Sequence, residues 1–378
     1  MSDLFPAYCE LISSPAQLAR CQEATSVSEL LSVIKSLWQQ TALSDDQLIA
    51  ELVQLNQQII DGDKIQLAGH WLPYRYHAKS RSIHWCLPAG HATEPFQDET
   101  ISRYRQTVLL NQFITPKTAL TSLDIQAKAV QSITPAGFIF HLSRCGSTLI
   151  SGCLSELDTS CVFSESPVLT DILLDRELGK TAQQQYLQQL IDLQASVFPS
   201  RPHVVIKWNA WDIFRWDLIR AIYPQVPCIF LVRNPVEILA SHQRSAGRHM
   251  SGDPTLAGVH LVFNKNQVVP VSLLDFRIDV LKELLAEIQL IGAGSSVCRV
   301  DYHQLDLDKL SEICTYFRIP FTSKEVSRIK SRLGFHSKSP MLRFNEDGVE
   351  KQKLFSPMDV KRIEQILLPL YNQFSKNN

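Results

Sequence analysis

The second half of the chain alternates short apolar runs with longer segments of helical periodicity. The runs are three to six residues long and almost continuously apolar, as is typical of strands buried on both faces of a parallel sheet. The alternation predicts an α/β fold over residues 136–378, a P-loop-like parallel β-sheet flanked by helices. The expected strands are Phe138–Leu142, Cys161–Phe163, His203–Trp208 and Cys228–Val232, and the expected helices are Leu149–Leu157, Pro167–Leu178, Ala210–Ile222 and Leu273–Ile291.

The first 130 residues follow a different pattern. Apolar residues recur with helical spacing between Ser14 and Asp61, where Ser44 is a candidate N-cap. Residues 70–100 contain aromatics, prolines and short strand-like pieces such as Ser82–Leu87, and residues 116–135 are expected to form a helix and a connector. We therefore expect a helix-rich N-terminal region, residues 1–130, whose role the sequence does not indicate.

Composition restricts the class of protein. The 378 residues include 37 basic and 38 acidic side chains, so no global field attracts nucleic acid or an anionic membrane. Nine cysteines without a Cys-x-x-Cys pair favour reduced thiols. The start of the sequence lacks the pattern of a secretory signal, and no stretch is long enough to span a membrane. These features predict a cytoplasmic protein.

Four histidines suggest a metal site. His70, His77, His84 and His91 recur every seven residues. That spacing matches neither a His-Glu-x-x-His helix nor a Cys/His finger, so ordinary loop and edge-strand histidines are the preferred interpretation. No metal is expected.

A polar loop follows the first strand of the α/β region. A loop between a strand and a helix faces the free N–H groups of the first helical turn, where an anion can bind. Arg144 offers a planar fork for phosphate or sulfate, and Gly146 allows close backbone approach. A Walker A motif is absent, because the loop has one glycine and no lysine. The predicted anion loop contains Arg144, Cys145, Gly146, Ser147 and Thr148.

Two charged residues follow neighbouring runs. Glu165 comes directly after the second strand and Lys207 ends the third, so both are expected at the carboxyl edge of the sheet, where ligands bind in open α/β folds. Glu165 could be a general base, or a carboxylate that stabilises the next helix N-terminus. Lys207 could be a second cation facing the anion loop, or a lysine that meets solvent.

Another basic residue stands at the end of the fourth strand. Asn234 is expected to cap the next helix, with Pro235 in its first turn and Glu237 completing a capping box. Capping does not require Arg233, which supplies a bidentate fork for phosphate, or Ser241, which is eight residues farther along the chain.

These motifs together resemble a known family. Arg144-Cys145-Gly146-Ser147-Thr148-Leu149 resembles the 5′-phosphosulfate loop of the sulfotransferases that use 3′-phosphoadenosine 5′-phosphosulfate (PAPS). Arg233-Asn234-Pro235 with Ser241 resembles the family's 3′-phosphate-binding motif. A weaker echo spans Cys298 to Pro320, interpreted as scaffold because Asp301-Tyr302-His303 departs from the usual Tyr-Glu pair. The resemblance covers residues 136–340.

The resemblance implies transfer of a sulfuryl group from PAPS to an acceptor hydroxyl, or to an amine. It implies that Arg144 and Lys207 stabilise charge, and that Glu165 is the base, as in members with a carboxylate after the second strand. The histidine base of other members has no counterpart in Lys207-Trp208-Asn209. By the same resemblance Ser337 and Lys338 are expected to reach the cofactor, although a solvated turn is the alternative.

Two other functions remain open on the sequence. A P-loop kinase or nucleotide hydrolase would depend on Mg²⁺ and is disfavoured by the missing loop lysine. A non-catalytic module of the same fold would bind a phosphorylated ligand or a protein without turnover. The acceptor could be a small metabolite, a lipid head group, a saccharide or a peptide side chain, and the oligomeric state is not indicated.

Overall fold

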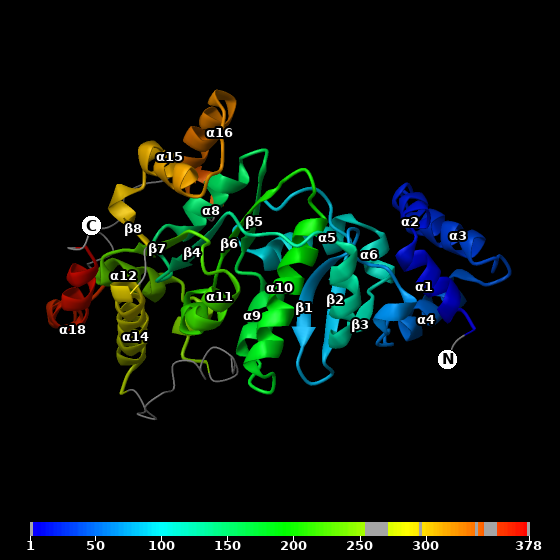
Figure 1. Cartoon of the computed structure of the whole chain (residues 1–378), viewed down its shortest axis with the longest axis horizontal. Helices are drawn as coiled ribbons and strands as arrows, with labels where there is room; N and C mark the ends of the chain where they lie inside the picture. The colour runs from blue at the N-terminus through cyan, green and yellow to red at the C-terminus, as the bar shows by residue number, and fades with distance from the viewer. Residues whose placement is uncertain (1–2, 254–270, 295–296, 337–338, 344–353, 376–378) are drawn as a thin grey trace. The chain divides into compact units, whose positions relative to one another are not determined.

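Contacts divide the chain into two compact units. The N-terminal unit comprises residues 1–133 and 166–202, and the C-terminal unit comprises residues 134–165 and 203–378. The sequence indicated a break near residues 130–136 but not that residues 166–202 pack with the N-terminal segment. The computed structural model describes residues 3–253, 271–294, 297–336, 339–343 and 354–375 (Figure 1).

The N-terminal unit combines helices with a small antiparallel sheet. Four short helices come first, and the cap predicted at Ser44 is present, because its hydroxyl accepts the N–H of Gln47 at 3.2 Å in a capping box. The strand expected from Ser82 is β2, which lies between β1 and β3. Strand β3 was not predicted within residues 116–135. The elements are α1 Phe5–Ser13, α2 Pro15–Gln22, α3 Val27–Leu37, α4 Asp45–Leu55, β1 Leu72–His77, β2 Ser82–Cys86, α5 Gln97–Thr107, α6 Leu110–Phe113, β3 Lys117–Ala119, α7 Leu123–Gln126, α9 Pro167–Leu174 and α10 Lys180–Ser196.

Gln126 stabilises the connecting segment of residues 62–68 in this unit. Its buried side-chain Oε1 accepts the N–H groups of Leu67 (2.8 Å) and Ala68 (3.1 Å), and its Nε2 donates to the carbonyls of Ile65 (2.8 Å) and Gly62 (3.3 Å). One amide side chain thus supplies hydrogen-bond partners for four backbone groups that are not paired by helix or sheet hydrogen bonds.

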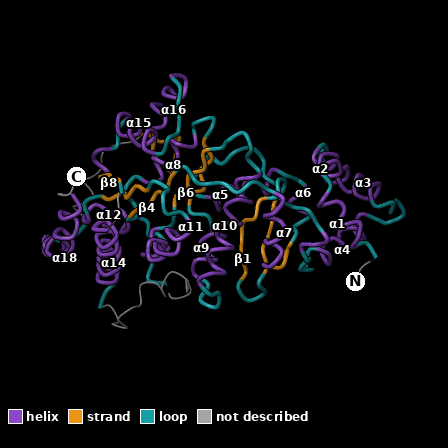
Figure 2. Tube along the Cα trace, viewed as in Figure 1, coloured by secondary structure: helices purple, strands orange, loops and turns teal. Residues whose placement is uncertain are grey.

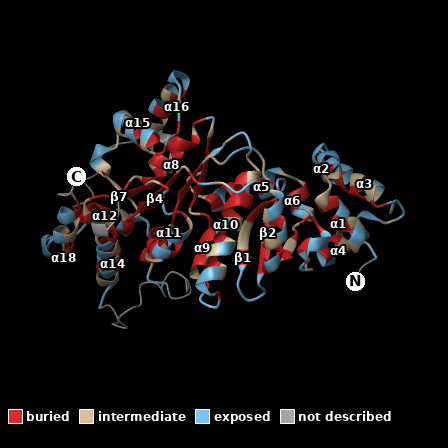
Figure 3. Ribbon diagram, viewed as in Figure 1, coloured by how far each residue is buried: buried red, intermediate tan, exposed pale blue. Residues whose placement is uncertain are grey.

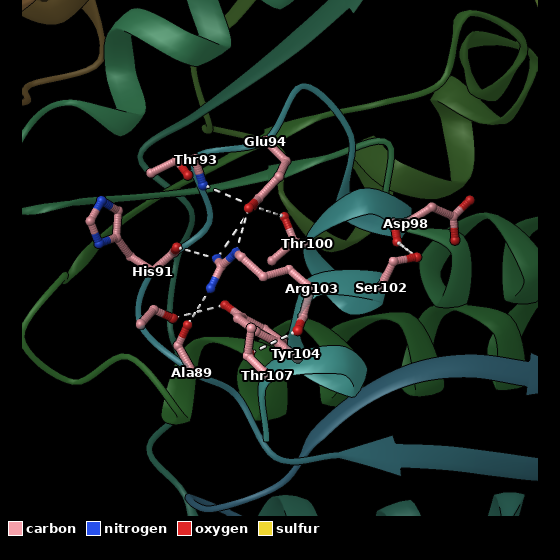
Figure 4. Close-up of polar contacts among 11 residues, drawn as sticks. Ala89, His91, Thr93, Glu94, Asp98, Thr100, Ser102, Arg103, Tyr104 and Thr107 are labelled. Atoms are coloured by element: carbon pink, nitrogen blue, oxygen red, sulfur yellow. Dashed lines mark hydrogen bonds and ion pairs between the residues drawn. The ribbon is translucent and has the colours of Figure 1, made fainter. Parts of the chain in front are cut away.

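Arg103 on α5 stabilises the loop that follows β2 (Figure 4). Its guanidinium pairs with the Glu94 carboxylate and donates to the carbonyls of Ala89 (2.5 Å) and His91 (2.9 Å). Thr100 donates its hydroxyl to Glu94 at 2.7 Å. Burial raises the pKa of Glu94, but the hydrogen bonds from Arg103 and Thr100 outweigh it and lower the pKa to about 2.

The C-terminal unit contains a five-stranded sheet in the order β5-β6-β4-β7-β8, in which every neighbouring pair is parallel. Figure 2 draws the strands in orange and labels β4, β6 and β8 of this sheet. The predicted α/β fold with a parallel sheet is therefore confirmed. The segment expected as one helix from Ala210 is a 3-10 turn, Ala210–Arg215, followed by α11. The elements are β4 Gly137–His141, α8 Ser147–Ser155, β5 Ser160–Ser164, β6 His203–Lys207, α11 Trp216–Ile222, β7 Cys228–Val232, α12 Pro235–Arg244, α14 Leu273–Gly294, β8 Cys298–Asp301, α15 Leu307–Tyr316, α16 Ser323–Leu333, β9 Phe335–His336, β10 Ser339–Arg343 and α18 Pro357–Ser375.

The two faces of the parallel sheet are covered differently. Side chains alternate along a strand, so Ile139 of β4 faces the aliphatic core under α8, α15 and α16, while Phe138 and Phe140 face the opposite side. There Phe140 packs against Trp208, Trp216 and Phe230, with ring centroids 5.4–6.2 Å apart. Strands β4 and β7 are buried along their whole length (Figure 3), which explains their continuous apolar sequence.

Candidate active site

The strand order determines which side chains meet. Strand β4 lies between β6 and β7, so the loop after β4 is flanked by Lys207 at the end of β6 and Arg233 directly after β7. Strand β5 lies beside β6 with Ser164 opposite Lys207, which brings Glu165 next to that lysine. All these residues stand at the carboxyl edge of the sheet, where the sequence predicted them.

The anion loop has an unusual backbone. The φ angles of Ser143, Arg144 and Gly146 are 65°, 53° and 89°. These values lie in the left-handed region, which residues other than glycine rarely adopt. At Gly146 a Cβ atom would also lie 2.4 Å from Cδ1 of Leu305 and 2.9 Å from Cδ2 of Tyr302, so these side chains would have to move. The N–H groups of Leu149 and Ile150 bond to the Gly146 carbonyl (2.9 and 3.1 Å), so those of Ser147 and Thr148 precede the first bonded turn of α8.

Cys145 contributes its backbone to this loop. Its side chain is fully buried in the aliphatic core with Ile139 and Ile150. Burial raises the pKa of the thiol to about 12, although the nearby N–H groups of Leu142 and Ser147 lower it. The side chain of Cys145 is therefore a neutral core residue.

Lys207 and Glu165 form an ion pair. The side chain of Lys207 is 0% exposed, and its Nζ lies 2.9 Å from Oε1 of Glu165 and 3.4 Å from Oγ1 of Thr148 in the first turn of α8. The alternative interpretation of Lys207 as a lysine that meets solvent is therefore wrong. A cation from strand β6 reaches the anion loop, which has no lysine of its own.

Glu165 is held on several sides. Its φ angle is 54°, and its N–H donates to the Lys207 carbonyl at 2.7 Å. Burial raises the pKa of Glu165, but the charge of Lys207 and the adjacent His141 outweigh burial and hold the pKa well below its ordinary range. The carboxylate is 20% exposed, so an ionised group reaches the surface beside the anion loop.

Arg144 is half-buried in the same loop. Its Nη2 donates to the backbone carbonyl of Ser245, just after α12. Burial lowers the pKa of Arg144 and the charge of Glu165 raises it, which indicates that the two side chains act on each other electrostatically.

Arg233 is oriented by Glu237. Its Nε and Nη2 donate to Oε2 of Glu237 at 2.6 and 2.5 Å, while Nη1 lies 3.4 Å from the Arg144 carbonyl. The capping box predicted for Glu237 is therefore wrong, since its carboxylate holds the arginine. The predicted cap at Asn234 is confirmed, because Oδ1 accepts the Val236 N–H at 2.9 Å.

One predicted residue lies apart from these contacts, and one predicted pair is not described. Ser241 is partly exposed on α12, and no side-chain hydrogen bond joins it to the site in the described part of the chain. Ser337 and Lys338 lie outside the described residues, as do residues 254–270 of the long loop after Gly247.

The site also includes two residues that the sequence motifs did not reveal. The Tyr302 ring lies under the Arg233 guanidinium, with Cζ 3.9 Å from the ring centroid, and its edge faces Gly146. Thus the segment interpreted as scaffold contacts both motifs. His141, the last residue of β4, places Nε2 3.5 Å from Oε1 of Glu165. A polar residue ending an apolar strand was its only sequence signal.

The histidines of the N-terminal unit do not converge. His70 and His91 are exposed, whereas the rings of His77 and His84 lie 4.3 Å apart. Burial, with His77 and Lys117 nearby, lowers the pKa of His84 to about 4. Among the described residues no group of three or more His, Cys, Asp or Glu side chains could hold a metal ion. Within the same ranges, no helix is both long and apolar enough to cross a bilayer.

Comparisons with known proteins give structural likeness only. No protein-family model matches the sequence, and no curated protein matches it. Among solved structures, the chain is similar to the sulfotransferase STF9 from Mycobacterium avium (11% identity, 67% of this chain and 79% of that chain, TM-score 0.44). It is also similar to sulfotransferase STF1 from Mycobacterium tuberculosis (12% identity, 90% of this chain and 99% of that chain, TM-score 0.39). A third similar structure is mouse sulfotransferase SULT7A1 complexed with PAP (14% identity, 68% of this chain and 89% of that chain, TM-score 0.34).

Proposed function

We propose that this protein transfers a sulfuryl group from PAPS to an acceptor hydroxyl, or to an amine, by direct in-line displacement. The observation that carries the proposal is the ion pair of Glu165 with Lys207, which joins a candidate base to an anion loop at one edge of the sheet. In a binding module Glu165 would only balance the charge of the buried Lys207, whereas in a transferase it can also take a proton.

The donor end of the site fits a sulfated nucleotide. PAPS supplies an activated sulfuryl group whose transfer needs no metal. The N–H groups of Ser147 and Thr148, with Arg144 and Lys207, offer donors for its phosphosulfate. Arg233, fixed in orientation by Glu237 and the Tyr302 ring, offers Nη1 to the 3′-phosphate. Ser241, Ser337 and Lys338 are proposed as further contacts on the sequence motif alone.

The acceptor end depends on Glu165. A carboxylate that is ionised at neutral pH can take the proton of an incoming hydroxyl as the oxygen–sulfur bond forms. The bond from sulfur to the bridging oxygen breaks, and the electron pair leaves on the 5′-phosphate of adenosine 3′,5′-bisphosphate (PAP). Lys207 and Arg144 stabilise the charge that develops on these oxygens.

We propose, as the sequence predicted, that residues 136–378 carry the chemistry and that residues 1–130 have a separate role. Nine free cysteines support a reducing compartment such as the cytoplasm. The acceptor is proposed to be a small molecule or a peptide side chain.

The donor is tested by calorimetric titration with PAP, ADP and ATP, on the wild type, on Arg233→Ala and on the surface control Lys324→Ala. We expect PAP to bind at least tenfold more tightly than ADP, and Arg233→Ala to lose that preference while Lys324→Ala keeps it. Preference for ATP, or indifference to Arg233, would overturn the PAPS assignment and favour a kinase.

Turnover is tested by release of PAP from PAPS in the presence of simple phenols, alcohols and amines, with and without EDTA. Release that depends on an acceptor and survives EDTA supports transfer. Tight PAP binding without release on any of these acceptors would favour the non-catalytic module.

A further inference from the structure

His141 is a buried side chain that the donor site does not require. It ends strand β4 and is 4% exposed. Its Nδ1 accepts the N–H of Ser143 at 2.9 Å. In a neutral imidazole one nitrogen accepts and the other donates, so this contact places the proton on Nε2.

The Nε2 atom faces the candidate base. It lies 3.5 Å from Oε1 of Glu165, longer than a formed hydrogen bond, and no formed bond to Nε2 exists among the described residues. Hydrogen bonds of catalytic groups are often long without substrate and shorten when it binds. A buried donor without an acceptor costs free energy, and the acceptors beside this ring are the Glu165 carboxylate and the Trp208 carbonyl.

The charged and titratable groups around His141 come from several elements. They are Glu165 after β5, Lys207 at the end of β6, the Trp208 carbonyl directly after Lys207, Arg144 in the loop, and His249. Burial lowers the pKa of His141, although Glu165 and the Trp208 carbonyl raise it. The ring is thus neutral near pH 7, as the assigned tautomer requires.

Both neighbours of the carboxylate approach the same oxygen. Lys207 Nζ lies 2.9 Å and His141 Nε2 lies 3.5 Å from Oε1 of Glu165. Oε1 is thus the carboxylate oxygen that both donors approach most closely, and the Glu165 side chain remains 20% exposed. Two donors on one oxygen fix the rotation of the carboxylate and leave the other oxygen to accept a proton.

We propose that His141 is a positioning residue which, with Lys207, holds Oε1 of Glu165 so that Oε2 receives the proton of the acceptor. The inference rests on the proposed sulfuryl transfer. The acceptor hydroxyl gives its proton to Oε2, while the proton on Nε2 of His141 stays where it is. His141 therefore affects the rate through Glu165 and makes no contact with the donor.

Two substitutions of His141 test the roles of its two ring nitrogens separately. His141→Asn keeps an acceptor for the Ser143 N–H but removes the donor to Glu165. His141→Gln places an amide N–H near the position of Nε2. We expect kcat to fall about 10–100-fold in His141→Asn, the size of one lost hydrogen bond to a charged group, and to recover to within about tenfold of wild type in His141→Gln. The KM for PAPS should change less than about threefold in both.

The pH profile adds a readout that a purely structural role would not move. Losing a donor to the carboxylate raises the pKa of Glu165, so the acid limb of kcat/KM should move to higher pH in His141→Asn and return in His141→Gln. Equal losses in the two variants with an unmoved limb would overturn the proposal. PAP affinity and circular dichroism show whether each variant is folded.

A measurement without turnover separates this inference from the proposed function. Carbon-13 NMR of the protein labelled at glutamate side-chain carboxyls, with the Glu165 signal assigned by its loss in Glu165→Gln, follows the titration of this carboxyl. A higher midpoint in His141→Asn but not in His141→Gln supports the contact even if PAPS is not the donor. An unchanged midpoint in both, alongside active wild type, would overturn the His141 proposal and leave sulfuryl transfer intact.

Discussion

The Nζ atom of Lys207 lies 2.9 Å from Oε1 of Glu165, and the lysine side chain is fully buried. The pair arises because Ser164 and Lys207 are register partners in neighbouring parallel strands. A buried ammonium requires an opposite charge, and a carboxylate beside an ammonium stays ionised. One ion pair therefore accounts for the burial of Lys207 and for the ionised state of Glu165.

Glu165→Gln should abolish transfer while leaving PAP binding nearly intact. The amide keeps the shape and still accepts a hydrogen bond from Lys207, but it cannot take a proton. We expect turnover to fall about 10²–10⁴-fold, the usual contribution of a general base, with PAP affinity within about threefold of wild type. Release of PAP from PAPS and calorimetry measure the two, with the exposed Asp217→Asn as control. Equal loss of both would refute the assignment of the base.

Lys207→Met should slow transfer and change its pH dependence. Methionine fills the buried space without the charge, so turnover should fall about 10²–10³-fold, as when one donor to a developing anion is removed. Loss of the neighbouring cation also raises the pKa of Glu165, so the acid limb of the pH–rate profile should move to higher pH. A limb that stays in place would mean that Lys207 does not control the ionisation of Glu165.

Gly146→Ala should damage the anion loop. The position has φ 89°, which strains any residue with a side chain, and the added methyl group would lie 2.4 Å from the Leu305 side chain and 2.9 Å from the Tyr302 ring, so these side chains or the loop must shift. We expect PAP affinity to fall at least about tenfold by calorimetry. Gly179→Ala is the control, because nothing lies within 4 Å of its added methyl group. Normal affinity in Gly146→Ala would mean that the loop does not hold the ligand.

Gln126→Leu should destabilise the N-terminal unit. The change keeps the approximate size but leaves four backbone groups of residues 62–68 without their partner. We expect the free energy of unfolding to fall by about 3 kcal/mol, measured by denaturant titration, while the exposed Gln22→Leu changes it by less than about 0.5 kcal/mol. A loss no larger than in the control would show that the four bonds contribute little.

Glu94→Gln should remove part of the acid sensitivity of the same unit. The folded pKa of Glu94, about 2, is below its ordinary value, so its stabilisation is present above the unfolded pKa and is lost as the pH falls toward 2. The wild type should therefore lose stability between about pH 4.5 and 2 that the variant has already lost at pH 7. Thermal unfolding across this range, with the exposed Glu23→Gln beside it, measures the difference. Parallel curves for wild type and Glu94→Gln would contradict the prediction.

The sequence alone determined the local features of this protein. Long apolar runs predicted strands β4, β6 and β7, because a strand buried on both faces has no polar side to show. Caps at Ser44 and Asn234 followed from the residues beside them, since a cap bonds to groups two or three positions away. The carboxyl-edge positions of Glu165, Lys207 and Arg233 followed from strand ends.

Tertiary structure decided which of these groups touch. The order β5-β6-β4-β7-β8 flanks the anion loop with Lys207 and Arg233, and no local pattern specifies strand order. Glu237 looked like a capping partner, yet a guanidinium four residues away offers a charged bond stronger than a backbone N–H. The role proposed for His141 depends on Glu165, 24 positions along the chain, because only the folded sheet brings the buried ring beside that carboxylate.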